Sequence, residues 1–287
     1  MSVRRVDPLS GSLVVVAGTR QHRPNLPDGC PFCPGGLEAP EPYDVRWFPN
    51  RWPPMPDDRC EVLLFSPEHG ASLGTLGHTG VRRVIDLWAE RTSSLAARAD
   101  VAYVLLFENR GAVAGATIDH PHGQLYAFDV IPEAPERELR AGRCALCADR
   151  PEPDLLVRAL GGWTVSVPFA PMWPYELLLA PTTHVPDLPS LPEAGRNGLA
   201  VALADALTRL DQLFDAPMPY MLWVHQRPTD GAVWPSAHVH IHIAPSLRQP
   251  GVTRHVAAGE LGSGVWFDPV APEDAAASLR SLPGAGR

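Results

Sequence analysis

The chain repeats one ordered series of landmarks, and this repeat constrains its fold more than any other feature. Each half has a C-x-x-C pair, a tryptophan–proline step, an apolar stretch with a histidine just beyond it, a helical pattern and a histidine cluster. The second cysteine and the lone histidine are 36 residues apart in the first half (Cys33, His69) and 37 in the second (Cys147, His184). This order and spacing predict a duplication. The alternative is that similar α+β parts recur independently.

Short apolar runs predict strands, and longer periodic runs predict helices. The predicted strands are Ser12–Gly18, Glu61–Ser66, Val101–Glu108, Gly123–Phe128, Trp163–Phe169, Tyr175–Ala180, Tyr220–His225 and His238–Ala244. Helices are predicted around Val81–Trp88, over Gly198–Phe214 and near PEDAAASLRSL. Strict strand–helix alternation is absent, which favours an α+β fold with antiparallel sheets and helices packed on one side. The repeat divides the chain into modules at residues 1–140 and 141–287.

Charge and hydropathy exclude several classes of protein. The formal net charge of -8 leaves no basic surplus for phosphates, so we expect no nucleic-acid partner. No apolar run approaches the ~18 residues that a membrane span needs. The N-terminal sequence MSVRRVDPLSG lacks the apolar core of a signal peptide. We therefore expect a cytoplasmic protein that does not enter a membrane.

Four of the five cysteines form the two C-x-x-C pairs, CPFC and CALC. In a cytoplasmic chain such pairs indicate metal ligation or redox chemistry. The first pair lies in the loop-like sequence PDGCPFCPGG, which favours a metal. Two thiolates and two imidazoles form a closed tetrahedral zinc site of the structural kind. The first predicted set is Cys30, Cys33, His69 and His120. The alternative is a cysteine pair in a proline-rich loop beside unrelated histidines.

His120 and His122 lie two residues apart, so on a strand both side chains would face one side. One imidazole can bind the metal while the other projects into a cleft. An imidazole without metal, with one nitrogen hydrogen-bonded to the backbone, is a nucleophile toward phosphorus. Gly123 leaves space beside it, and the Gln124 amide can donate to a phosphoryl oxygen. A lone histidine of this kind is more often a core residue, but a pair followed by Gly-Gln favours a site.

The stretch FENRGAVAGATIDHPHGQ resembles the active-site signature of the galactose-1-phosphate uridylyltransferases, which belong to the histidine-triad superfamily. The resemblance implies two duplicated histidine-triad modules. It further implies that His122 attacks the α-phosphorus of UDP-glucose and holds the uridylyl group until galactose 1-phosphate accepts it. Gln124 would bind the oxygens of this intermediate. The family builds its sugar site across a subunit boundary, so a homodimer is expected.

The same resemblance implies a set of substrate-binding residues. They are Arg20, Arg23, Phe48, Asn50, Asn109, Thr117 and Glu260. For each arginine the alternative is a solvated surface charge. The segment His255–Pro269, which carries Glu260, resembles the family's sugar-contacting segment only loosely. Asp119 departs from the family pattern, and its charge either lies beside the phosphates or orients an imidazole.

The second half offers two candidate metal sites. The mirrored set is Cys144, Cys147, His184 and His238. A set used by some relatives, which would bind zinc or iron, is Glu138, His225, His240 and His242. Since His238, His240 and His242 are expected to share one strand face, we predict that only one set is filled, and we favour the cysteines. His242 stands where Gln124 stands in the first half, so a single catalytic site is expected.

Two rival functions remain open at this level. One is an adenylyl-transferring enzyme or a dinucleoside polyphosphate phosphorylase of the same fold. The other is a noncatalytic zinc-binding module. The base retained in a covalent adduct separates the first rival from uridylyl transfer, and the absence of any adduct would indicate the second.

Overall fold

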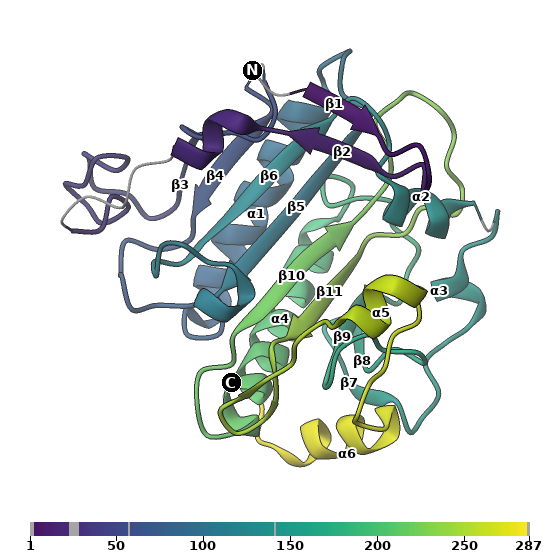
Figure 1. Cartoon of the computed structure of the whole chain (residues 1–287). Helices are drawn as coiled ribbons and strands as arrows, with labels where there is room; N and C mark the ends of the chain where they lie inside the picture. Colours follow the sequence, from purple (N-terminus) through teal and green to yellow (C-terminus); the bar gives the residue numbers. More distant parts are fainter. Residues whose placement is uncertain (1–2, 23–28, 57, 141, 286–287) are drawn as a thin grey trace.

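A nine-stranded antiparallel sheet forms the centre of the computed structural model, which describes residues 3–22, 29–56, 58–140 and 142–285 (Figure 1). The strand order is β3-β4-β6-β5-β10-β11-β9-β8-β7. The strands are β3 (Arg46–Pro49), β4 (Cys60–Leu64), β5 (Tyr103–Arg110), β6 (His122–Phe128), β7 (Leu156–Leu160), β8 (Trp163–Ser166), β9 (Leu177–Pro181), β10 (Tyr220–His225) and β11 (His240–Pro245). The predicted α+β class with antiparallel sheet is confirmed.

The two halves join where β5 pairs with β10, with Phe107 opposite Trp223. From this seam outward, β5, β6, β4 and β3 repeat as β10, β11, β9 and β8, and β7 is an additional edge strand. The registers repeat as well, because Val62 pairs with Gln124 as Leu178 pairs with His242. The division at residue 140 stays a prediction, since the sheet continues across it.

Two long helices, α1 (Gly77–Ala96) and α4 (Glu193–Leu213), pack together against one face of the sheet (Figure 1). The apolar stripe predicted from Val81 to Trp88 lies on the buried side of α1. The third predicted helix is α6 (Pro272–Ser281), which packs on β7 and α4. Proline at its first position suits a helix start, where no hydrogen-bonded N–H is needed.

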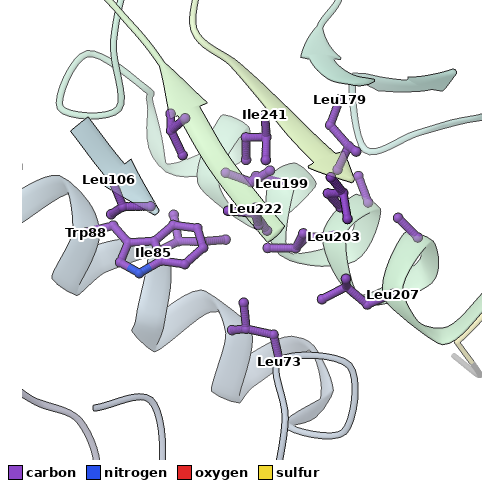
Figure 2. Packing of buried hydrophobic residues seen from close by; sticks show 14 of the residues in the cluster. Leu73, Ile85, Trp88, Leu106, Leu179, Leu199, Leu203, Leu207, Leu222 and Ile241 are labelled. Carbon is purple, nitrogen blue, oxygen red and sulfur yellow. The ribbon is translucent and has the colours of Figure 1, made fainter. Parts of the chain in front are cut away.

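The main core fills the space between these helices and the sheet. Figure 2 shows Trp88 of α1, Leu106 of β5, Leu222 of β10 and Leu203 of α4 in this layer, each at most 1% exposed. Burying a leucine or isoleucine side chain contributes about 1.5–3 kcal/mol. Because side chains alternate along a strand, the residues between these core positions point to the opposite face. That face carries the candidate site.

Smaller elements complete the fold. They are β1 (Val3–Val6), β2 (Leu13–Val16), β12 (Leu247–Gln249), β13 (Val252–Thr253), the 3₁₀ turns η1 (Gly18–His22) and η2 (Ala112–Ala114), and the helices α2 (Glu133–Leu139), α3 (Ala145–Ala148) and α5 (Ala258–Ser263). The predicted strand at Ser12–Gly18 is the shorter β2, which pairs with β1 outside the main sheet. Within the described ranges, no helix has both the length and the apolar character required to cross a membrane.

Candidate active site and metal centres

Two histidines at the start of β6 face different surroundings. His120 precedes the strand, and its Nδ1 lies 3.7 Å from the Sγ atoms of both Cys30 and Cys33. His122 is the first residue of β6. It lines a cavity to which neither Cys30 nor Cys33 contributes. As predicted, one imidazole (His120) faces the cysteines and the other (His122) faces a cavity.

The first predicted ligand set, Cys30, Cys33, His69 and His120, is assembled with all ligand atoms within 4.8 Å of one another. The His120 Nε2 atom faces the carbonyl oxygen of Ser66 at 2.8 Å, so the ring hydrogen belongs on Nε2 and the Nδ1 lone pair points to the sulfurs. Burial lowers the pKa of His120, which favours the neutral imidazole that a metal requires. This donor set fits a tetrahedral cation.

The mirrored set, Cys144, Cys147, His184 and His238, is assembled in the same way. The Nδ1 of His238 lies 3.3 Å from Cys144 Sγ and 3.5 Å from Cys147 Sγ. The Nδ1 of His184 lies 3.3 Å from Cys147 Sγ. Burial lowers the pKa of His238 to about 4, so its imidazole is neutral near pH 7. The site fits the same kind of cation as the first.

A third set, Glu138, His225, His240 and His242, gathers where α2 faces β10 and β11. The His225 Nδ1 lies 2.9 Å from a Glu138 oxygen, and the His240 Nε2 lies 3.3 Å from it. Burial alone would raise the pKa of Glu138, but hydrogen bonds from His225 and His240 outweigh it and hold that pKa well below the ordinary value. Three imidazoles and one carboxylate suit zinc or iron.

The two second-half sets share no residue and both are assembled at once, so the geometric reason for expecting only one of them to be filled does not hold. Which of the two sets binds a metal stays a prediction. The expectation treated His238 to His242 as one continuous strand. In the structure β11 begins at His240, and the N–H of Val239 donates to the carbonyl of Val185, which lies outside the strands of the sheet. His238 is therefore directed to the cysteines, while His240 and His242 face Glu138.

A cavity of about 380 Å³ lies beside His122, within the size range of small-ligand sites. It brings together seven of the predicted catalytic and substrate-binding residues: Arg20, Phe48, Asn50, Asn109, Thr117, His122 and Gln124. Arg23 lies outside the described residues. A second cavity, of about 440 Å³, also borders His122, and Asp119 is among the residues that line it.

The orientation of His122 is set by its own backbone neighbourhood. Its Nδ1 donates to the carbonyl oxygen of His120 at 2.7 Å. A carbonyl only accepts, so the hydrogen is on Nδ1 and the lone pair is on Nε2. A Cβ at Gly123 would lie 2.7 Å from Phe65 Cζ and 3.0 Å from the Phe107 carbonyl oxygen, so only glycine allows this close packing.

The Gln124 amide is oriented by Asn50. The Nδ2 of Asn50 donates to Gln124 Oε1 at 3.2 Å, which leaves the NH₂ group of Gln124 as a donor. Gln124 lies on β6 two residues after His122, so both side chains face the cavity. The strand therefore presents a nucleophile and a hydrogen-bond donor side by side.

Glu260 does not join this cavity. It lies in α5, is 8% exposed, and accepts hydrogen bonds from the Arg254 guanidinium (2.5 Å) and the Ala257 N–H (2.8 Å). Neither cavity that borders His122 includes Glu260. Within one chain it caps α5.

Three residues near these sites were missed by sequence reasoning. The Phe32 ring lies 5.2 Å from the His122 ring and 5.8 Å from Phe48, so it forms one wall of the cavity. The Tyr43 hydroxyl contacts His120 Nε2 at 2.9 Å, and Glu176 approaches His242. The position of Phe32 between the first two cysteines was the one available signal.

Known proteins resemble the chain over nearly its whole length. Two family descriptions match: galactose-1-phosphate uridyl transferase, N-terminal domain, at residues 55–132, and C-terminal domain, at residues 148–285. A galactose-1-phosphate uridylyltransferase of Thermotoga maritima is 31% identical, over 96% of this chain and 97% of that protein. One of Streptomyces lividans is 34% identical, over 98% of this chain and 86% of that protein.

The fold agrees with these sequence matches. The solved structure of a uridylyltransferase superposes with a TM-score of 0.88 at 29% identity and covers 98% of each chain. The match includes both halves of the duplicated sheet rather than one module. Because both family descriptions match and relatives above 30% identity align over most of their length, the chain belongs to the galactose-1-phosphate uridylyltransferase family of nucleotidyltransferases.

Proposed function

We propose that this chain transfers a uridylyl group from UDP-glucose to galactose 1-phosphate through a covalent intermediate on His122. The observation that carries the proposal is the ring orientation of His122, whose Nδ1 hydrogen is donated to the His120 carbonyl, so that Nε2 is the nitrogen that carries the nucleophilic lone pair. The cavity beside it holds Arg20 and Gln124, groups that suit a diphosphate. Its size fits a nucleotide.

The first half-reaction forms a phosphorus–nitrogen bond between His122 Nε2 and the α-phosphorus. The bond from that phosphorus to the bridging oxygen breaks, and glucose 1-phosphate leaves with the electron pair. The His120 carbonyl stabilises the positive charge that develops on the imidazole, since Nδ1 keeps its hydrogen. A phosphate oxygen of galactose 1-phosphate then attacks the α-phosphorus and restores His122. The Gln124 amide donates to a nonbridging oxygen in both steps.

The metal centres have a supporting role in this proposal. We propose zinc in both cysteine–histidine sets, because thiolates and imidazoles favour it, and zinc or iron in the glutamate–histidine set. A closed zinc site supplies a crosslink between distant segments rather than a reactive position. In the first set that crosslink holds the backbone of His120, and His120 in turn orients His122.

A labelled substrate tests the function directly. The protein is incubated with UDP-glucose labelled in the uracil and, separately, with base-labelled ATP, then denatured and digested. We expect uracil label on the peptide that contains His122 and none from ATP. Adenine label on that peptide would establish the adenylyl-transferring rival. Absence of both labels would favour a noncatalytic zinc-binding module.

We also propose that the enzyme is a homodimer in which Glu260 of one copy contacts the hexose bound by the other. Within one chain Glu260 lines neither of the cavities beside His122, and exposed apolar side chains such as Val6 (65%) and Leu261 (77%) suit a partner surface. Mixing inactive His122→Asn with inactive Glu260→Ala protein should restore transfer in mixed dimers. If no mixture recovers activity while the sizes of the species show dimers, this arrangement is wrong.

A further inference from the structure

Glu176 is a buried carboxylate whose two oxygens face different partners. It is 5% exposed and precedes β9 at the end of a turn in which Tyr175 has a φ of 60°. Its Oε2 accepts hydrogen bonds from the backbone N–H groups of Met172 (2.8 Å) and Trp173 (3.2 Å). One oxygen is therefore committed to the turn, and the position of the other oxygen is fixed as a result.

The second oxygen, Oε1, lies 3.5 Å from the Nδ1 of His242. Both ring nitrogens of His242 are buried and make no hydrogen bond within the described part of the chain. The Trp223 ring stacks on the imidazole, with centroids 4.9 Å apart and planes within 10°. Its Nε2 points to the glutamate–histidine set, 3.9 Å from Glu138 Oε1. Buried polar nitrogens normally have partners, so this ring requires one on each side.

We propose that Glu176 is the positioning residue that prepares His242 to bind a divalent cation. A carboxylate only accepts, so Oε1 places the ring hydrogen on Nδ1 and leaves the Nε2 lone pair directed at the cation. The inference rests on the proposed loading of the glutamate–histidine set. His240 uses another acceptor for the same purpose, because its Nδ1 donates to the carbonyl oxygen of His238 at 2.8 Å.

The internal repeat supplies an independent comparison. His242 and Gln124 occupy equivalent register positions, opposite Leu178 and Val62. Two residues before these partners stand Glu176 in the second half and Cys60 in the first. The carboxylate therefore occurs in the half whose strand carries a histidine, and is absent from the half whose strand carries a glutamine.

The test is Glu176→Gln. The amide oxygen can still accept from Met172 and Trp173, so the turn is retained. The NH₂ group then faces Nδ1 and favours the hydrogen on Nε2, which removes the ligand lone pair. We expect about 10–100-fold weaker binding of Co²⁺ at this set. Co²⁺ bound at the glutamate–histidine set is recognised because its spectrum lacks the thiolate-to-cobalt bands that the two cysteine–histidine sets give. As a control, the metal content of those two sets should not change.

A double-mutant cycle separates positioning from a structural effect. His242→Ala removes the ligand itself, so adding Glu176→Gln to it should cause no further loss of Co²⁺ affinity. Wild-type Co²⁺ affinity and spectrum in Glu176→Gln would overturn the inference. Additive losses in the double variant, or no metal at this set in the wild-type chain, would overturn it as well. None of these measurements uses uridylyl transfer, so a missing adduct on His122 leaves the inference intact.

Discussion

His122 donates its Nδ1 hydrogen to the carbonyl oxygen of His120, the residue whose own Nδ1 faces the sulfurs of Cys30 and Cys33. One short backbone segment thus connects a metal ligand to the proposed nucleophile. A cation that fixes the His120 ring also fixes the peptide that orients the His122 ring. The second half has the corresponding bond, from His240 to the His238 carbonyl, but there the imidazole turns to Glu138.

This connection predicts unequal effects for two matched cysteines. Cys33 contacts both histidines of the first set, at 3.6 and 3.7 Å, and Cys147 contacts both of the mirrored set, at 3.3 and 3.5 Å. Cys33→Ser and Cys147→Ser should each lose one of three metal ions per chain. Only Cys33→Ser should lower kcat, by about 10–100-fold. Metal analysis with steady-state kinetics checks this, and equal kinetic losses would contradict the connection.

His122→Asn should abolish transfer without damage to the fold. We expect a fall in kcat of at least ~10³-fold, since the covalent route needs the imidazole. The ring lies outside all three metal sets of the described residues, so metal content and Tm should match the wild type. Isotope exchange between UDP-glucose and labelled glucose 1-phosphate measures the first half-reaction alone. Wild-type exchange in this variant would rule out His122 as the nucleophile.

Gln124→Glu tests the donor beside the nucleophile. The amide NH₂ is replaced by a negative charge that repels the phosphoryl oxygens, while Asn50 can still donate to the side chain. We expect kcat to fall about 10²–10³-fold. Gln249→Glu, in the exposed strand β12, carries the same charge change away from the cavity and should be neutral. Equal rates in the two variants would show that the amide does not contact the phosphoryl group.

Sequence reasoning identified those parts of the site that are encoded by spacing along the chain. The two cysteine–histidine sets follow from the C-x-x-C pairs and their repetition, and the pairing of His122 with Gln124 follows from a short pattern. The glutamate–histidine set was reached only through the family resemblance. Phe32 and Glu176 were missed because their roles arise from contacts between distant segments. The position of Phe32 between two cysteines places it near a metal set but does not indicate an aromatic wall of the cavity, and the sequence around Glu176 does not indicate a carboxylate behind a histidine.

The sequence predicted the central elements of the fold but not the strands at the edges of the sheet. Both long helices and the inner strands show clear periodicity, whereas β3 and β7 were not predicted. Each of these strands is four or five residues long and lies at an edge of the sheet, where one neighbour is enough and the apolar pattern is weak. The error about His238 has a related cause, since a continuous alternation of residues does not reveal where the backbone leaves the sheet.

Gly198→Ala should destabilise the protein, although the same change normally stabilises a helix interior by about 1 kcal/mol. A Cβ at Gly198 of α4 would lie 1.8 Å from the carbonyl oxygen of Gly161 in the β7–β8 turn. The helix and the turn must separate, which should lower Tm by several degrees. Gly195→Ala is the control in the same helix, because its nearest contact is a side-chain carbon at 3.3 Å. Similar Tm values for both variants would show that the close approach of Gly198 to the Gly161 carbonyl does not require glycine.

Glu108 lies on β5 at the seam between the two halves, and it should make the free energy of unfolding depend on pH. Burial raises its pKa to about 8, against the hydrogen bond from Tyr220 and the charge of Arg110, which lower it. Between its ordinary pKa near 4.5 and about 8 the folded chain therefore holds a proton that the unfolded chain has released. Stability is highest below this range and falls as pH rises through it.

Glu108→Gln removes that proton and can keep the Tyr220 bond, because the amide oxygen also accepts. The Tm of the wild type relative to this variant should therefore decrease steadily from about pH 5 to about pH 8. Thermal melts in matched buffers give the difference, and the subtraction cancels groups that titrate alike in both proteins. A difference that stays constant with pH would mean that Glu108 is ionised in the folded chain, with its charge balanced by Arg110.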